Sequence, residues 1–224
     1  MSDEMIDDSV AFPTVDEDKF RIVGLYGALT DKKAADIVFS MMGLAHTGEK
    51  VKYNLTEEQE LQLEAAHKEG DETFSFEEEE LEKETIYEPF DFLISTPGGV
   101  AVEMLAVYDT MRDIRQKMDI HTLGIGKVMS AGVPLLAAGT KGKRRIGANC
   151  RVMIHSVIGG VGGNMHEIEV EAKEILFMQE QYKKILMEES SMTEDQVCDL
   201  LNTKTNNYLS AEEAVEFGIA DIII

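Results

Sequence analysis

The sequence predicts an α/β fold built around a mostly parallel β-sheet. Short apolar runs alternate along the chain with stretches whose apolar residues recur every three or four positions, and turn-forming or helix-capping residues separate the two kinds of segment. The chain has 224 residues, enough to bury roughly three quarters of the surface that its unfolded form exposes. We therefore expect a single domain spanning residues 1–224.

The alternation begins near the N-terminus. Phe20–Tyr26 is an apolar run that ends at Gly27 and predicts a buried strand. Asp31 begins a predicted helix whose buried face has apolar residues three or four positions apart (Ala34, Ile37, Val38, Met41 and Met42). A second strand is predicted over Phe90–Ser95, and it is closed by the turn residues Pro97-Gly98-Gly99.

The same pattern continues to the C-terminus. After the turn, apolar residues that step by four and three predict an amphipathic helix (Val100, Met104, Val107, Met111, Ile114 and Met118). His121–Val128 predicts a third strand, which an apolar helical stretch follows. Glu167–Met187 predicts a long helix, and capping boxes that begin at Thr193 and Ser210 predict two more. Gly218 is placed to end the last helix, and residues 219–224 predict a final strand.

Negative charge is concentrated in one segment. The chain carries 43 acidic and 21 basic side chains, a net charge of −22. Fourteen of the acidic residues lie between Glu57 and Glu88, with only two lysines among them. Self-repulsion and low apolar content make this segment a poor core former. It is predicted to be a solvated insertion or a surface helix, and a docking site for a basic partner or a cation is the alternative.

Composition excludes several classes of protein. The acidic excess argues against nucleic-acid or anionic-membrane partners, which need clustered Lys and Arg. No apolar stretch approaches the roughly 20 residues that span a bilayer, and the acidic N-terminus does not begin like a signal peptide. Two cysteines give no disulfide framework, and no His, Cys or Asp spacing indicates a metal site. We expect a soluble cytoplasmic protein.

Two turns that follow predicted strands contain residues suited to chemistry. The glycines of Ser95–Gly99 let the backbone approach a ligand closely, and N–H groups at the start of the following helix could bind an anion. A plain tight turn explains them equally well. Ser130 follows the third strand and could project from the sheet edge as a nucleophile, or serve only as a helix N-cap. Its surroundings do not match the Gly-x-Ser-x-Gly elbow of α/β-hydrolases.

A third candidate lies around His155. This residue ends the apolar run Arg151–His155, so a satisfied core histidine is the ordinary interpretation, and a residue that carries chemistry is the alternative. The glycine-rich run Gly159–Gly163 follows it. Glycines in an extended backbone often mark a place where another chain lies close, which favours peptide binding by strand addition as one interpretation.

In combination, these segments resemble the ClpP family of self-compartmentalising serine peptidases. The matching stretches keep their order from about residue 90 to the C-terminus, and more loosely over residues 20–45 (Ile94–Gly99, Ala106–Met111, Ser130–Gly132, Leu136–Arg144, Arg151–His155, Gly159-Gly160, Glu174–Leu176 and Leu209–Ala214). Several independent motifs in one order make this a specific resemblance.

The resemblance implies a crotonase-like repeated ββα superhelix, with seven subunits in a ring and two rings stacked around a closed chamber. Residues 167–187 would be the handle helix that helps to join the rings. The implied activity is that of a serine endopeptidase that uses no cofactor and receives substrate from an AAA+ unfoldase. The implied site residues are the nucleophile Ser130, the general base His155, the third triad position Asn206, the oxyanion-hole N–H groups of Gly98 and Ala131, and the substrate-binding residues Gly99, Ile158, Gly159, Gly160 and Val161.

Three departures from the family pattern affect these expectations. Asn206 stands where the family has an aspartate, and residues 200–211 contain no acidic side chain. An amide oxygen can accept a hydrogen bond from His155 but cannot stabilise an imidazolium by charge, so an attenuated peptidase is expected. Residues 48–88 are an addition that should project outward, because burying so much charge is costly. Residues 1–18 do not resemble the family's axial loop, which weakens the inference of ATPase docking.

Two other functions remain open at this point. The same departures are those expected of a non-catalytic, ClpR-like ring subunit that assembles with an active paralogue. A crotonase-type acyl-CoA enzyme would share the fold, but it does not need the pair of Ser130 and His155. Its coenzyme also carries phosphates that a chain of charge −22 would repel.

Overall fold

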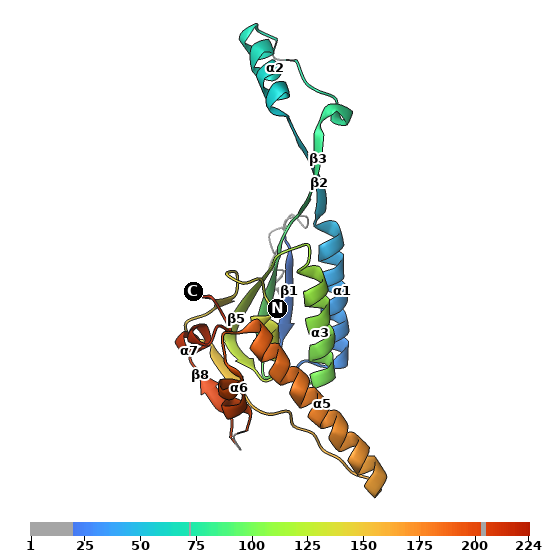
Figure 1. Ribbon diagram of the computed structural model, residues 1–224, viewed down its shortest axis with the longest axis vertical. Coiled ribbons are helices and arrows are strands. Elements are labelled where there is room, and N and C mark those ends of the chain that lie inside the picture. Colours follow the sequence, from blue (N-terminus) through green and yellow to red (C-terminus); the bar gives the residue numbers. More distant parts are fainter. Residues whose placement is uncertain (1–19, 72, 203–204) are drawn as a thin grey trace, which may run out of the picture.

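The computed structural model describes residues 20–71, 73–202 and 205–224 (Figure 1). The acidic segment 1–18 singled out in the sequence therefore lies outside the described residues. Within them, helices and strands alternate as the apolar periodicity predicts, and the predicted amphipathic helices are present.

The centre of the domain is a mostly parallel sheet. In the described residues it has seven strands, with the order β1-β4-β5-β6-β9, and β7 and β8 branch from β5. Every pairing in this sheet is parallel except that of β7 with β8. The strands are β1 (Ile22–Tyr26), β4 (Phe90–Thr96), β5 (Ile120–Met129), β6 (Arg145–Ile146), β7 (Arg151–Ile154), β8 (Asn207–Leu209) and β9 (Ile222–Ile223). The expected α/β class is thereby confirmed.

Alternation along β4 shows which face of the sheet holds the core. Phe90, Phe92 and Ile94 are fully buried, whereas the residues between them are half-exposed. Helices α1 (Asp31–Thr47) and α3 (Ala101–Ile114) lie side by side over one face (Figure 1), and α4 (Gly132–Ala137) packs beside α3. The remaining helices are α5 (Met165–Glu189), α6 (Glu194–Leu201) and α7 (Ala211–Glu216).

Capping residues fix where these helices begin. The Thr30 side chain accepts a hydrogen bond from the Lys33 N–H at the start of α1. Asn164, Thr193 and Ser210 each form a complete capping box with the residue three positions later. The predictions made from Thr193 and Ser210 are therefore confirmed, and α5 begins two residues before its predicted start.

The C-terminal strand is shorter than predicted. Only Ile222–Ile223 pairs, with β6, because the N–H groups of Ile219 and Ala220 bond back to the Ala214 carbonyl and continue the turn after α7. Phe217 is the C-cap of α7, and Gly218 follows it with φ +68°, a conformation that favours glycine.

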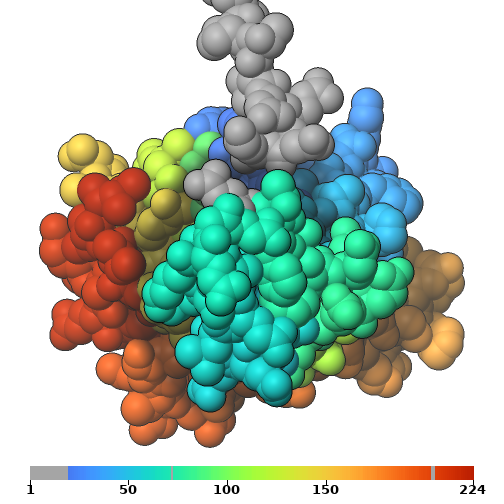
Figure 2. All heavy atoms as spheres, turned by 90° about the horizontal axis from the view of Figure 1, so that it is seen from above, coloured from blue at the N-terminus to red at the C-terminus, as the bar shows by residue number. Residues whose placement is uncertain are grey.

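Residues 48–71 and 73–88 form a projection. Its base is an antiparallel ribbon of β2 (Glu49–Asn54) and β3 (Glu82–Tyr87), and between these strands lie α2 (Glu57–Lys68) and the short 3₁₀ helix η2 (Glu78–Glu80). The projection leaves the domain at the end opposite to the start of α5 (Figure 1), and a view along it shows it standing over the middle of that end (Figure 2). No residue of α2 or η2 is buried, as the cost of burying charge requires.

Candidate active site

The turn between β5 and α4 holds Ser130 in a strained conformation. Ser130 has φ +51°, and it is the only non-glycine residue with a positive φ among the described ones. Such a conformation costs roughly 1–2 kcal/mol for an L-residue, and the surrounding bonds must hold it. One of them is the bond that the Ser130 N–H donates to the Met153 carbonyl of β7, at 2.8 Å. The serine therefore sits at a sharp strand-to-helix turn.

Gly98 packs directly against Ser130. A Cβ at position 98 would lie 2.6 Å from the Ser130 Cβ and 3.1 Å from its Oγ, and Gly98 has φ +99°. Only glycine fits this position. The Pro97-Gly98-Gly99 turn is held in place by Leu29, whose N–H donates a hydrogen bond to the Gly98 carbonyl at 2.9 Å. The backbone of the predicted Pro-Gly-Gly turn thus lies directly against the candidate nucleophile.

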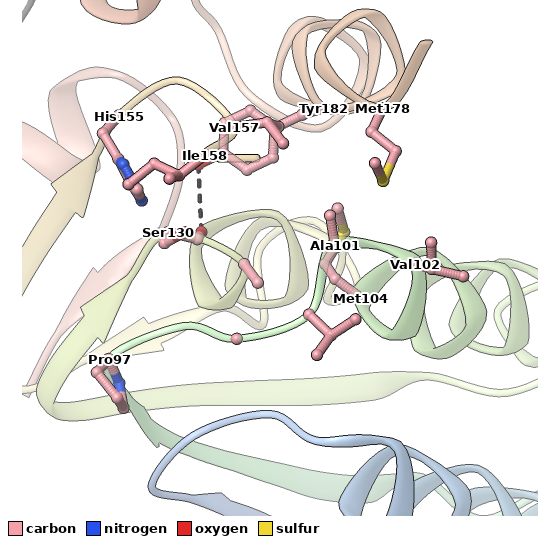
Figure 3. Close-up of a pocket in the computed structure, with 13 residues that line it drawn as sticks. Pro97, Ala101, Val102, Met104, Ser130, His155, Val157, Ile158, Met178 and Tyr182 are labelled. Carbon is pink, nitrogen blue, oxygen red and sulfur yellow. Dashed lines mark hydrogen bonds between the residues drawn. The ribbon is translucent and has the colours of Figure 1, made fainter. Parts of the chain in front are cut away.

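His155 follows the last residue of β7 and is half-buried. Its ring is directed toward Ser130 across the mouth of a pocket (Figure 3). Burial lowers the pKa of His155 below its ordinary value of 6.5. The imidazole is therefore neutral at neutral pH, which is the form that can accept a proton.

Strand register relates Asn206 to His155. In the antiparallel pair of β7 and β8, Ile154 is opposite Asn207, and continuing by one residue places Asn206 opposite His155, on the same face of the ribbon. Asn207 faces the other way, and its side-chain amide donates to the Leu200 carbonyl at 2.6 Å. Asn206 is exposed, and within the described part of the chain no hydrogen bond joins it to His155.

The two candidate oxyanion donors differ in their present bonding. The Ala131 N–H makes no hydrogen bond to any described residue. The Gly98 N–H donates to the Thr96 Oγ1 at 3.0 Å, and that buried hydroxyl donates in turn to the Gly27 carbonyl at 2.7 Å. Gly98 can serve as a second donor only by turning or by sharing its N–H between two acceptors.

Beside Ser130 lies a pocket of about 540 Å³. Its walls come from the Pro-Gly-Gly turn, the start of α3, the segment after β7 and the side of α5 (Pro97, Gly99, Val100, Ala101, Val102, Met104, Ser130, Ala131, His155, Val157, Ile158, Met178 and Tyr182). The lining is predominantly apolar. A cleft of this size and composition can hold an apolar side chain of a bound peptide next to the reacting groups.

Only some of the substrate-binding residues expected from the sequence line this pocket. Gly99 and Ile158 line it, whereas Gly159, Gly160 and Val161 lie outside its lining and are exposed. Gly159 lies against α5, where a Cβ would meet the Ile175 side chain at 2.2 Å. Met104, Met178 and Tyr182 line the pocket but were not anticipated. Their apolar spacing on α3 and α5 does not distinguish a pocket wall from ordinary core.

The described residues offer no metal site and no membrane-spanning helix. Among these residues no group of three or more His, Cys, Asp or Glu side chains could hold a metal ion. No helix in the described ranges is both long enough and apolar enough to span a membrane.

Residues 73–224 match the model of the Clp protease family. The chain belongs to the Clp protease family. The match covers β4 through β9, and so includes Ser130, His155, Asn206 and both candidate oxyanion donors. It also agrees with the mixed α/β fold and its mostly parallel sheet. Membership of this family supports a ClpP-like peptidase or a related subunit.

Proposed function

We propose that this member of the Clp protease family is a serine endopeptidase that cleaves unfolded polypeptides and peptides. The observation that carries the proposal is the position of Ser130. Its backbone is held at φ +51° beside Gly98, and a neutral His155 is directed at it across an apolar pocket. A buried structural serine needs neither the strain nor the facing base.

In this mechanism His155 accepts the proton of the Ser130 hydroxyl as Oγ attacks the carbonyl carbon of the scissile peptide. The Ala131 N–H donates to the oxygen that becomes negative, and the Gly98 N–H joins it when the Pro97–Gly98 peptide turns away from Thr96. Protonated His155 then gives its proton to the leaving amine, which leaves an acyl ester on Ser130. Water, deprotonated by His155, hydrolyses that ester and restores the serine.

Asn206 acts as the third triad member, but its uncharged amide can perform only part of the role of an aspartate. Its amide oxygen can accept the second N–H of His155 and hold the ring, but it carries no charge to stabilise the imidazolium. In proteases with a Ser-His-Asp triad, changing the Asp to Asn lowers kcat by about 10⁴. We therefore expect slow turnover from this enzyme.

The proposal includes assembly into two stacked rings of seven subunits, with α5 as the handle helix between them. Supporting this, the first half of α5 exposes apolar side chains that a second copy would cover (Met165, Ile168, Val170, Leu176 and Phe177). The acidic projection leaves the domain at the opposite end. In a double ring it would extend outward, on the side from which an AAA+ unfoldase would approach.

The direct test is hydrolysis of fluorogenic peptides by the purified protein. The wild type should turn over peptides with an apolar residue before the cleaved bond, and Ser130→Ala should abolish this turnover while leaving the assembly intact. Equal rates for the two proteins would refute the proposal, because the activity would then come from a contaminant or another site.

A non-catalytic ring subunit is the second candidate. Two observations favour it: the Gly98 N–H is engaged by Thr96, and no hydrogen bond joins Asn206 to His155 among the described residues. This function predicts mixed rings when the chain is co-expressed with an active paralogue, together with no turnover by the pure protein. Peptide cleavage by pure homomeric rings would exclude it.

A further inference from the structure

A tyrosine on the long helix α5 contacts the backbone of the candidate nucleophile. The hydroxyl of Tyr182 donates a hydrogen bond to the Ser130 carbonyl oxygen at 3.2 Å (Figure 3), across 52 residues of sequence. Tyr182 is only 3% exposed, and its ring forms part of the pocket wall. The bond therefore links α5 to the turn that carries the reacting group.

The peptide group that receives this bond is the one that supplies an oxyanion donor. The Ser130 C=O and the Ala131 N–H belong to one planar unit and point in opposite directions. Whatever holds the carbonyl therefore aims the N–H. The Val133 N–H also donates to the Ser130 oxygen, at 2.9 Å, so two donors from separate elements fix this plane.

The strain at Ser130 explains why the plane needs fixing. A residue at φ +51° gains free energy by relaxing toward the common backbone regions, and a rotation of the Ser130–Ala131 peptide would accompany that relaxation. The Val133 bond belongs to the first turn of α4 and moves with it. Tyr182 reaches the carbonyl from another helix and opposes the rotation.

We infer that Tyr182 is a positioning residue that orients the Ser130–Ala131 peptide so that the Ala131 N–H points at the developing oxyanion. This role rests on the proposed peptidase function. A hydrogen bond to the carbonyl also polarises the peptide group and strengthens its N–H as a donor. Burial raises the pKa of the Tyr182 phenol, so the hydroxyl keeps its proton and remains a donor throughout the pH range of catalysis.

The test compares Tyr182→Phe with Tyr108→Phe. Both variants keep the ring and remove a buried hydroxyl, but the Tyr108 hydroxyl donates to Glu189 at 3.0 Å, and neither Tyr108 nor Glu189 lines the pocket. For Tyr182→Phe we expect kcat to fall about tenfold with KM unchanged, which is less than the 10²–10³ that follows removal of an oxyanion donor itself. Tyr108→Phe should keep wild-type kcat.

A peptide boronate inhibitor supplies a second readout. It forms a tetrahedral adduct with a nucleophilic serine and places an oxygen where the oxyanion develops, so its affinity should fall by the same factor as kcat in Tyr182→Phe. A non-covalent peptide ligand that fills only the pocket should bind both tyrosine variants as it binds the wild type. A tyrosine that merely packs against the substrate would weaken both ligands alike.

Three results would overturn the inference. A wild-type kcat in Tyr182→Phe would show that the hydroxyl has no role in turnover. A raised KM with unchanged kcat would make Tyr182 a substrate contact, and equal losses in the two variants would indicate general loosening of α5. If the wild type shows no activity that depends on Ser130, the proposed function fails and the role of Tyr182 fails with it. That failure is recognised from the wild type alone, whereas the other three results come from the tyrosine variants of an active wild type.

Discussion

Replacing Asn206 by aspartate should raise the kcat of the proposed peptidase. Continued register between β7 and β8 places this residue opposite His155, on the same face. A carboxylate there can accept the second imidazole N–H and stabilise the imidazolium that forms as Ser130 attacks. The negative charge also raises the pKa of His155, reversing part of the lowering that burial causes.

The size of the gain follows from exposure. The change of about 10⁴ seen in buried triads is an upper bound, because Asn206 is exposed and water weakens its interactions. An exposed ion pair alone contributes at most about 1 kcal/mol, whereas a hydrogen bond to a charged group contributes about 1.5–3 kcal/mol. Since His155 is half-buried, a gain near 1.4 kcal/mol is expected, which corresponds to about a tenfold rise in kcat.

The assay is peptide hydrolysis measured across pH, with Asn207→Asp as the matched control. Asn207 is the adjacent residue, but its side chain faces the opposite way and bonds the Leu200 carbonyl. The same new charge at position 207 should therefore not raise kcat. Asn206→Asp should also move the acidic limb of the kcat/KM profile to higher pH, because the pKa of His155 rises.

Two outcomes would refute this reasoning. If both aspartate variants changed kcat equally, the effect would come from general charge and not from the register of β7 and β8. If Asn206→Asp left both kcat and the acidic limb unchanged, residue 206 would not approach His155 in the working enzyme. Either result would remove Asn206 from the proposed triad.

Four further outcomes are expected. Gly98→Ala should abolish peptide hydrolysis without preventing folding, because its Cβ would lie 2.6 Å from the Ser130 Cβ; retained activity would contradict the close approach. Ser130→Gly should be more stable to denaturant than Ser130→Ala by about 1 kcal/mol, because glycine accepts a positive φ without strain; equal stabilities would argue against strain at this turn. In the wild type, activity should fall on acidification with a midpoint below pH 6.5, because burial lowers the pKa of His155 and the neutral base persists to lower pH; a midpoint above 6.5 would require a nearby negative charge. Glu189→Gln should lower the free energy of unfolding by about 3 kcal/mol, because this 5% exposed carboxylate accepts hydrogen bonds from Arg115 and Tyr108. Urea titration at pH 7 measures the change, and an unchanged midpoint would show that the ion pair of Glu189 and Arg115 contributes nothing to stability.

The sequence predicted the framework of sheet and helices because apolar burial and helix capping both leave local patterns in the chain. Apolar spacing located α1 and α3, and local capping side chains located the starts of α6 and α7. The short strands β6 and β8 escaped prediction, since two or three residues carry no periodicity and their pairing partners lie far along the chain. For residues 48–88, charge predicted exposure, but the ribbon of β2 and β3 depends on pairing between residues about thirty positions apart.

The sequence likewise predicted some features of the candidate site and not others. Ser130 stood out because it follows a predicted strand, and His155 because it ends an apolar run before a glycine-rich segment; the family resemblance then implied their roles. The strain at Ser130 could not be read from the sequence, because no glycine marks the positive φ. The bond from Tyr182 and the engagement of the Gly98 N–H by Thr96 depend on how separate elements pack. In the proposed mechanism both contacts act on the oxyanion donors.

The most direct test of the account is labelling by a fluorophosphonate probe, which reacts only with an activated serine. Wild type, Ser130→Ala and His155→Ala would be treated as intact assemblies, the labelled residue located by peptide mass spectrometry, and ring size read by native mass spectrometry. The account predicts slow labelling at Ser130 of wild-type rings, and none in either variant. Intact wild-type rings that remain unlabelled, or that are labelled equally without His155, would contradict the claim that this histidine activates Ser130.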